Sequence, residues 1–308
     1  MSILSNLLVD LFATKKASNH AAVDVTESVE NSIEIIKDLF ETNDLAGAQE
    51  KCKKTLTVHP NNLELQQLQS DIEFLKWSEY IKDKFPGPRY LEWLEWFHGK
   101  LQPASYLEIG VESGQSLQFA MPPTLAVGVD PAIRIVHSQE NWVKLFKLTS
   151  DDFFAQHDPK KVFGKNAIDF AFIDGLHTFD QALKDFINTE KYSTTQSVVL
   201  FHDIFPVISE TANRERTTKF WVGDTWKVML ILLKHRPDLK IFTIPTYPSG
   251  LGVVTNLDPN STLLQDKFDD ILKEAFAMEY DAFPGGIGNN LSLVENDFEV
   301  VSRLLNLH

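Results

Sequence analysis

The stretch Tyr106–Ser116, YLEIGVESGQS, joins a short apolar run to a turn that contains two glycines. The run has the length and composition of a buried strand. Gly110 and Gly114 have no Cβ atom, so the backbone there can lie against a ligand, and a following helix would present free N–H groups. A tight strand-to-helix turn explains the same glycines structurally. The rest of the sequence must decide between a ligand-binding turn and a purely structural one.

Short apolar runs alternate with longer, helix-compatible segments from Ser105 onward. The runs occupy 106–111, 125–130, 144–149, 168–174, 197–203, 240–245 and 250–255. Apolar strands that alternate with helices indicate an α/β fold, with a mostly parallel sheet covered on both faces. Only TYPSG separates the last two runs. That link is too short for a crossover helix, so these runs are expected to pair antiparallel at one end of the sheet.

The N-terminal region has helical periodicity from Glu30 to about Ser78, interrupted at Asn43 and again at Pro60. Proline cannot continue a helix, so three helices are expected. The stretch DLFETNDLAGAQEKCKKTLTVHPNN resembles a tetratricopeptide repeat in its small residues and its closing Pro-Asn-Asn. A solenoid needs about three repeats to stand alone. This segment is therefore expected to pack on the main domain or on a second subunit, as in a homodimer.

Composition excludes several classes of protein. The formal net charge of -14 argues against a nucleic-acid partner. The single cysteine, Cys52, rules out an intrachain disulfide and suits a reducing compartment. The sequence has no apolar run of the roughly 18 residues that a membrane span needs, and no secretory signal pattern. A cytoplasmic protein is expected, in which 3–12 forms a short amphipathic helix or a frayed terminal one.

Polar residues follow several of the apolar runs. Asp130 ends the second run, about 20 residues beyond the glycine turn, where an acid commonly binds ribose hydroxyls. Taken alone, it could equally cap a helix. Asp174 and His177 follow the fourth run, and His202 and Asp203 end the fifth. Because the carboxyl ends of parallel strands meet at one edge of a sheet, these side chains are expected to converge.

From about Ser105 to Thr255 the chain resembles the class I S-adenosylmethionine-dependent methyltransferases. The glycine turn matches the family's first motif, beside the methionine part of the cofactor, and Asp130 matches the acid that binds the ribose. LTSDDFF, at 148–154, matches the segment that contacts the adenine. The resemblance implies a Rossmann-like doubly wound sheet with an antiparallel last strand. It also implies a cofactor site formed by Glu108, Gly110, Gly114, Asp130, Ser150, Asp151 and Asp174.

Within that family, FIDGLHTFDQALKDF and LFHDIFP resemble the small-molecule O-methyltransferase branch. Such sites must take a proton from a hydroxyl, or bind it to a metal that lowers its pKa. His177, His202 and Asp203 are the expected catalytic residues, and Asp174 with Asp203 suits Mg²⁺ or Mn²⁺. Metal-dependent relatives carry two acids, or an acid and an asparagine, where this chain has His202 and Asp203. Whether the site binds a metal is therefore left open, and so is a purely structural role for the histidines.

The segment 210–240 is long and charged for a plain connector. Its polar and aromatic residues could form an acceptor pocket or lid that holds an anionic or sugar substrate. The candidates are Arg214, Arg216, Lys219, Trp221, Asp224, Trp226 and Lys227. A solvated loop leading into an amphipathic helix at 226–233 is the alternative. Further upstream, Trp93 and Trp96 are expected on a helix that covers the sheet.

The sequence therefore predicts a helical region at 1–100, a methyltransferase domain at 101–258 and a C-terminal helical extension at 259–308. The expected activity is methyl transfer from S-adenosylmethionine to an oxygen of a small acceptor such as a sugar or phenol. A non-catalytic scaffold that binds partners through the repeat-like helices is the alternative. A dinucleotide oxidoreductase is disfavoured because the turn lacks the third glycine of its fingerprint.

Overall fold

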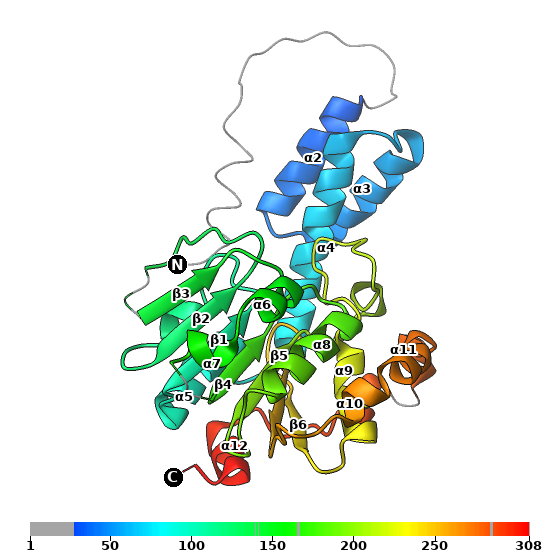
Figure 1. Ribbon diagram of the computed structural model, residues 1–308. Coiled ribbons are helices and arrows are strands. Elements are labelled where there is room, and N and C mark those ends of the chain that lie inside the picture. Colours follow the sequence, from blue (N-terminus) through cyan, green and yellow to red (C-terminus); the bar gives the residue numbers. More distant parts are fainter. Residues whose placement is uncertain (1–27, 139, 141, 165–166, 284–285, 308) are drawn as a thin grey trace. The chain divides into compact units, whose positions relative to one another are not determined.

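The computed structural model describes residues 28–138, 140, 142–164, 167–283 and 286–307 (Figure 1). The helix expected at 3–12 lies outside these residues. The chain divides into two compact units, Met1–Gln69 and Ser70–His308. Within the described ranges, no helix is both long enough and apolar enough to cross a membrane.

The first unit is helical, as expected. It contains α2 (Val29–Glu41), α3 (Leu45–Val58) and the beginning of α4 (Leu63–Lys84). The Ser28 side chain caps α2, and Asp44 caps α3 by accepting a hydrogen bond of 2.9 Å from the N–H of Gly47. Between the helices, Ala48 and Cys52 are fully buried. The likeness to a tetratricopeptide repeat stays a prediction.

The second unit is built on a seven-stranded sheet with the order β3-β2-β1-β4-β5-β7-β6. Strands β1 to β5 run parallel, whereas β7 lies antiparallel to both β5 and β6. This confirms the predicted Rossmann-like sheet and its reversed last strand. The strands are β1 (Ser105–Ile109), β2 (Leu125–Val129), β3 (Trp142–Phe146), β4 (Phe170–Ile173), β5 (Val198–His202), β6 (Lys240–Ile244) and β7 (Leu251–Thr255).

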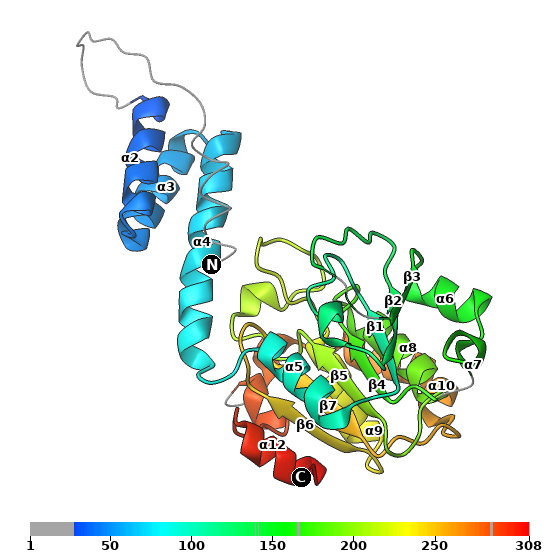
Figure 2. The same ribbon diagram turned by 90° about the vertical axis from the view of Figure 1, so that its left-hand side faces the viewer.

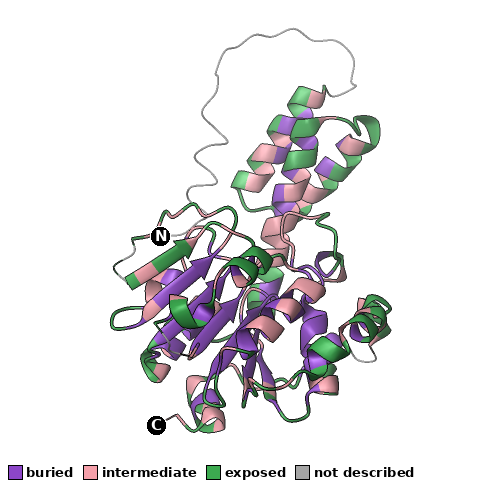
Figure 3. Cartoon of the chain, viewed as in Figure 1, coloured by how far each residue is buried: buried purple, intermediate pink, exposed green. Residues whose placement is uncertain are grey.

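Helices cover both faces of the sheet (Figure 2). On one face α5 (Tyr90–Leu101) and α12 (Phe298–Leu305) pack against alternate strand residues such as Tyr106. On the other face α6 (Ser150–Gln156), α8 (Phe179–Glu190) and α9 (Trp226–His235) pack against the intervening residues such as Leu107. The central strands are consequently buried on both faces (Figure 3). Trp93 of α5 is fully buried, as its expected core role requires.

One expectation for the glycine turn is wrong. No α-helix follows β1, and only the short 3₁₀ turn η1 (Leu117–Phe119) lies between β1 and β2. Gly114 has φ 77°, and prolines stand at 122 and 123. Left-handed backbone at one end and proline at the other leave too little chain between them for an α-helix.

The remaining elements are short or peripheral. The C-terminal extension begins with two short helices, α10 (Leu263–Asp266) and α11 (Phe268–Phe276). The others are α7 (Pro159–Val162), η2 (Ser209–Thr211), η3 (Tyr280–Ala282) and η4 (Ile287–Asn290). The sheet-covering helices α5 and α12 belong to the same compact unit as the sheet. The division at 1–100, 101–258 and 259–308 remains a prediction of the sequence.

A glycine substitution tests how tightly the strand ends are joined. A Cβ on Gly110 would lie 1.9 Å from the carbonyl oxygen of Asp174, at φ 92°. Gly164 also has a positive φ, of 67°, but no described atom lies within 4 Å of its Cβ position. Both alanine variants meet the left-handed penalty of about 1 kcal/mol, and only Gly110→Ala adds a backbone collision. We expect Gly110→Ala to lower the free energy of urea unfolding by about 3 kcal/mol or more, and Gly164→Ala by about 1 kcal/mol. Equal losses would contradict the close approach.

Candidate active site

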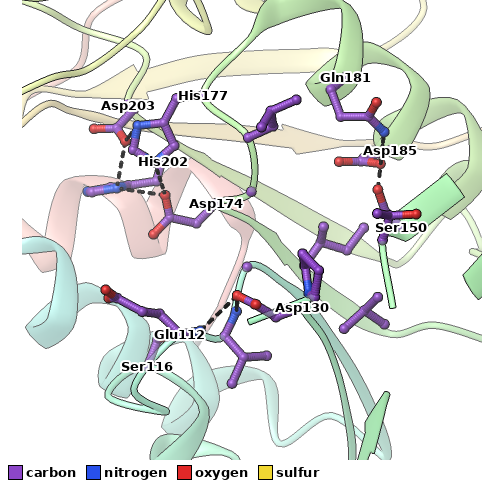
Figure 4. A pocket seen from close by; sticks show the side chains of 18 of the residues that line it. Glu112, Ser116, Asp130, Ser150, Asp174, His177, Gln181, Asp185, His202 and Asp203 are labelled. Atoms are coloured by element: carbon purple, nitrogen blue, oxygen red, sulfur yellow. Dashed lines mark hydrogen bonds and ion pairs between the residues drawn. The ribbon is translucent and has the colours of Figure 1, made fainter. Parts of the chain in front are cut away.

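A cavity of about 660 Å³ opens at the carboxyl ends of the parallel strands (Figure 4). Its walls come from the turn after β1, the ends of β2, β4 and β5, and the loop before α9. This is where open α/β sheets bind their ligands. The volume is in the usual range for a small-molecule site.

The turn after β1 is organised around the carboxylate of Asp130. One oxygen, Oδ2, accepts hydrogen bonds from the N–H groups of Val111 (3.0 Å) and Glu112 (2.9 Å). The other, Oδ1, accepts one from Ala132 (2.5 Å). A carboxylate oxygen can accept two hydrogen bonds, so Oδ1 keeps capacity for a ligand hydroxyl. Asp130 and Gly110 both line the cavity, as expected for cofactor-binding residues.

Glu108 lies beneath the turn, and its side chain does not line the cavity. It is fully buried and accepts hydrogen bonds of 2.7 Å from the hydroxyls of Tyr106 and Ser116. Burial raises the pKa of Glu108 to about 8, against the effect of these two bonds. Gly114 likewise shapes the turn without lining the cavity. Ser116, which sequence reasoning passed over although it stands in the same motif, does line it.

A cluster of four polar side chains lies at one end of the cavity, where α6 and α8 meet; it consists of Ser150, Asp151, Gln181 and Asp185. The Nε2 of Gln181 lies 3.1 Å from Ser150 Oγ, 3.0 Å from Asp151 Oδ1 and 3.0 Å from Asp185 Oδ1. Burial raises the pKa of Asp185 to about 7. Ser150 and Asp151 were expected here, whereas Gln181 and Asp185 were not. Their spacing of four residues on a helix that follows a strand-end motif was the available signal.

Two aspartates and two histidines meet at the other end, as predicted from the strand ends. His177 Nδ1 lies 2.9 Å from Asp203 Oδ2, and His202 Nδ1 lies 3.2 Å from Asp174 Oδ1. The crossed pairs are longer, at 3.6 Å for His177 with Asp174 and 3.6 Å for His202 with Asp203. Each carboxylate therefore contacts both rings.

This arrangement favours protonated histidines. Burial would lower the pKa of an imidazole, because it disfavours the charged form. The nearby carboxylates outweigh burial and raise the pKa of His177 to about 9 and that of His202 to about 10. The two histidines hold the pKa of Asp203 well below its usual range, again against burial. We therefore expect both rings to be protonated at neutral pH in the free protein.

Residues from distant parts of the sequence hold the cluster in place. Tyr90, the first residue of α5, places its ring 4.3 Å from that of His202. The Ser249 hydroxyl, just before β7, donates a hydrogen bond to Asp203. Trp221 stacks on His177 at 5.1 Å and an interplanar angle of 15°. Tyr90 and Ser249 carry no local signal that could have identified them, because only the fold brings them to the site.

The backbone at the cluster is strained. His177 has φ 59° and Asp203 has φ 56°, in the left-handed region that non-glycine residues seldom adopt. Such conformations persist where the surrounding structure fixes them, and they gather at functional sites. Beside them, a Cβ on Gly223 would lie 2.0 Å from the carbonyl oxygen of His177. The segment before α9 therefore lies against the strained loop at Gly223.

Three of the clustered residues could together hold a divalent cation. Asp174, His177 and Asp203 each offer one ligand atom, and these atoms lie within 4.8 Å of one another. Two carboxylate oxygens and one imidazole nitrogen suit Mn²⁺ better than Mg²⁺, which prefers oxygen ligands alone. In this arrangement His202 lies against the same two carboxylates and would compete with the cation for their charge.

The comparisons agree with this architecture. Residues 107–204 match the family model described as a methyltransferase domain. The strand order agrees with the Rossmann-like methyltransferase fold expected from the sequence. A search of curated proteins finds no match.

Several solved structures are distantly similar. The O-methyltransferase TomG from Streptomyces achromogenes has 16% identity, with 55% of this chain and 80% of its own covered, at a TM-score of 0.41. The methyltransferase PaMTH1 from Podospora anserina has 14% identity, with 60% and 87% covered, at 0.41. An O-methyltransferase from Bacillus cereus has 11% identity, with 82% and 96% covered, at 0.41. At this level of similarity they carry no argument about substrate.

The protonation state of the cluster can be measured directly. We expect side-chain NMR of the free protein to show His177 and His202 doubly protonated at pH 7.5, with titration midpoints above about 8. Asp203→Asn removes one of the charges that raise both pKa values, so both midpoints should fall in that variant. His59, an exposed histidine at the end of α3 and outside the cluster, provides a reference signal that Asp203→Asn should leave unchanged. Midpoints near 6.5 for the two cluster histidines would contradict the ion-paired arrangement.

Proposed function

We propose that this protein is an S-adenosylmethionine-dependent O-methyltransferase that acts on a small hydroxylated acceptor. One observation supports this most strongly. The Asp130-centred turn and the Asp174–Asp203 cluster line the same cavity, so a ligand on the turn would reach the titratable groups. A sugar or a phenol is the acceptor expected from the sequence.

The turn after β1 and the polar cluster around Gln181 would hold the cofactor. Gly110 lets the backbone approach the methionine part, Asp130 accepts from the ribose hydroxyls, and Ser150 with Asp151 faces the adenine. When bound, S-adenosylmethionine supplies an electrophilic methyl group on a sulfonium ion. The rest of the rate would come from alignment of the acceptor oxygen with that methyl group.

His177 is the proposed general base. It is the more exposed of the two histidines, with 25% of its side chain accessible against 7% for His202. Its Nδ1 lies 2.9 Å from Asp203 Oδ2, and its Nε2, 3.6 Å from Asp174 Oδ1, would take the hydroxyl proton. A protonated ring cannot accept that proton, so the pKa of His177 must fall in the loaded enzyme. The positive charge of the cofactor's sulfonium would act in that direction, because a nearby positive charge lowers the pKa of an imidazole. His202, deeper and against Tyr90, would balance the charge of the two aspartates.

A metal-assisted version of the same reaction is the second candidate. It is favoured by the close grouping of Asp174, His177 and Asp203. A cation held there would lower the pKa of the acceptor hydroxyl and replace His177 as the activating group. The His202 ring against both carboxylates leads us to prefer the metal-independent version. Homodimer formation, a cytoplasmic location and the absence of a nucleic-acid partner remain expectations from the sequence.

Calorimetry tests the cofactor site without knowledge of the acceptor. We expect the wild-type protein to bind S-adenosylmethionine with a dissociation constant in the micromolar range. Asp130→Ala should weaken binding at least about tenfold, because it removes the ribose acceptor and the anchor of the turn. Asp269→Ala, which removes an exposed acid on α11, is the matched control and should bind as the wild type does. Absence of binding by the wild type would contradict the methyltransferase proposal and favour the non-catalytic scaffold.

Thermal unfolding distinguishes the two versions of the reaction. In the metal-independent version, excess Mn²⁺ should leave the Tm of the wild type within about 1 °C of its value in EDTA, because nothing binds preferentially to the folded state. A rise of several degrees that disappears in Asp174→Asn would instead assign the cation site. Asp152→Asn, on exposed α6 surface, controls for nonspecific effects of charge.

A further inference from the structure

The segment 210–227, called the lid here, leads into the first turn of α9 and carries four cations whose surroundings differ. Arg214 forms a two-pronged ion pair with Asp180, at 2.8 and 3.1 Å. Lys227 lies 3.6 Å from the buried carboxylate of Asp224. Both charges are therefore neutralised by acids of the second unit, and neither residue lines the cavity.

Lys219 is neutralised as well. Its Nζ lies 2.6 Å from Asp71 Oδ1, a largely buried carboxylate on α4. The next residue, Phe220, packs edge-on against Phe74 of the same helix. Trp221 Nε1 donates a hydrogen bond of 2.7 Å to the carbonyl oxygen of Asn213, which closes the segment on itself. These contacts give the lid a defined position over the cavity.

Arg216 is the exception. Among the described residues, no carboxylate lies within ion-pair distance of its guanidinium, and it is the only lysine or arginine that lines the cavity. Its Nη2 donates one hydrogen bond, of 3.0 Å, to the carbonyl oxygen of Lys219, and the group lies 5.9 Å from the centroid of Trp221. The remaining N–H donors of the planar fork have no acceptor among the described residues and are available for a ligand.

The carboxylates that line the cavity have partners or lie elsewhere in it. Asp203 lies 2.9 Å from a ring nitrogen of His177, and Asp174 lies 3.2 Å from one of His202. Glu112 and Asp130 stand at the ends of β1 and β2, where the cofactor is proposed to bind, so an anionic group of the acceptor would be held by Arg216. A guanidinium fork fits a carboxylate or phosphate better than a point charge does.

We propose that the acceptor carries an anionic group, a carboxylate or a phosphate, which Arg216 binds while the acceptor hydroxyl faces His177. This inference rests on the proposed function, because it names the substrate class of the same cavity. It narrows the acceptors to hydroxylated acids and phosphorylated hydroxyl compounds, and it disfavours neutral sugars and simple phenols. Arg216 would act as a specificity residue.

The test uses three fluorinated probes on the full chain saturated with S-adenosylhomocysteine. Fluorine NMR would compare 4-fluorobenzoate and 4-fluorophenyl phosphate with the neutral 4-fluorobenzamide. We expect at least one anion to bind about tenfold or more tightly than the amide, as one charge-assisted contact provides. Arg216→Gln should abolish that preference, and Arg216→Lys should keep part of it. Arg303→Gln, an exposed arginine on α12, is the control and should change nothing.

Each outcome has a defined meaning. The anion that is preferred identifies carboxylate or phosphate as the recognised group. Absence of a preference in the wild type, including absence of detectable binding by all three probes, would overturn the proposal, as would a preference that survives in Arg216→Gln. Failure of S-adenosylhomocysteine to bind would count against the proposed function instead. The anion preference can still be measured on the unloaded protein, so the two failures are distinguishable.

Discussion

The close approach of Gly110 to Asp174 is the constraint on which the rest of the site depends. The carbonyl oxygen of Asp174 occupies the space that a side chain at Gly110 would need. The N–H of Asp174 donates to the carbonyl of Ile109 at 2.8 Å, and the N–H of Gly110 donates to Val129 at 2.9 Å. The ends of β1, β2 and β4 are therefore joined through main-chain atoms. The spacing between the turn after β1 and the titratable cluster is consequently a property of the sheet, independent of side-chain rotamers.

Electrostatics explains why the cluster can stay buried. An isolated carboxylate or imidazolium in a protein interior costs several kcal/mol of folding free energy. Here Asp174 and Asp203 share two histidine rings, so no charge lacks an opposite partner. The same contacts oppose the left-handed backbone strain at His177 and Asp203. Loss of any one partner would leave a buried charge uncompensated, so the four residues behave as one unit.

The strand pattern was readable from the sequence because parallel strands buried on both faces appear as continuous apolar runs. The clustering of Asp174, His177, His202 and Asp203 followed, since strand ends share an edge of the sheet. The direction of the Glu108 side chain was not predicted correctly from the motif. Its position in the motif suggested a cofactor contact, yet strand alternation turns its side chain away from the cavity and into the protein. Tyr90 and Ser249 were unpredictable, because their proximity arises only from long-range packing.

The match to the methyltransferase family model begins at residue 107, but the physical domain begins earlier. The ring against His202 comes from Tyr90, and the carboxylate that holds the lid comes from Asp71. A fragment that began at the first matched residue would also expose the sheet face that Trp93 covers. Such a piece would keep the recognisable motifs and lose the parts that position them. In evolution, α5 and the part of α4 from Ser70 onward would therefore have to change together with the lid and the sheet that they contact.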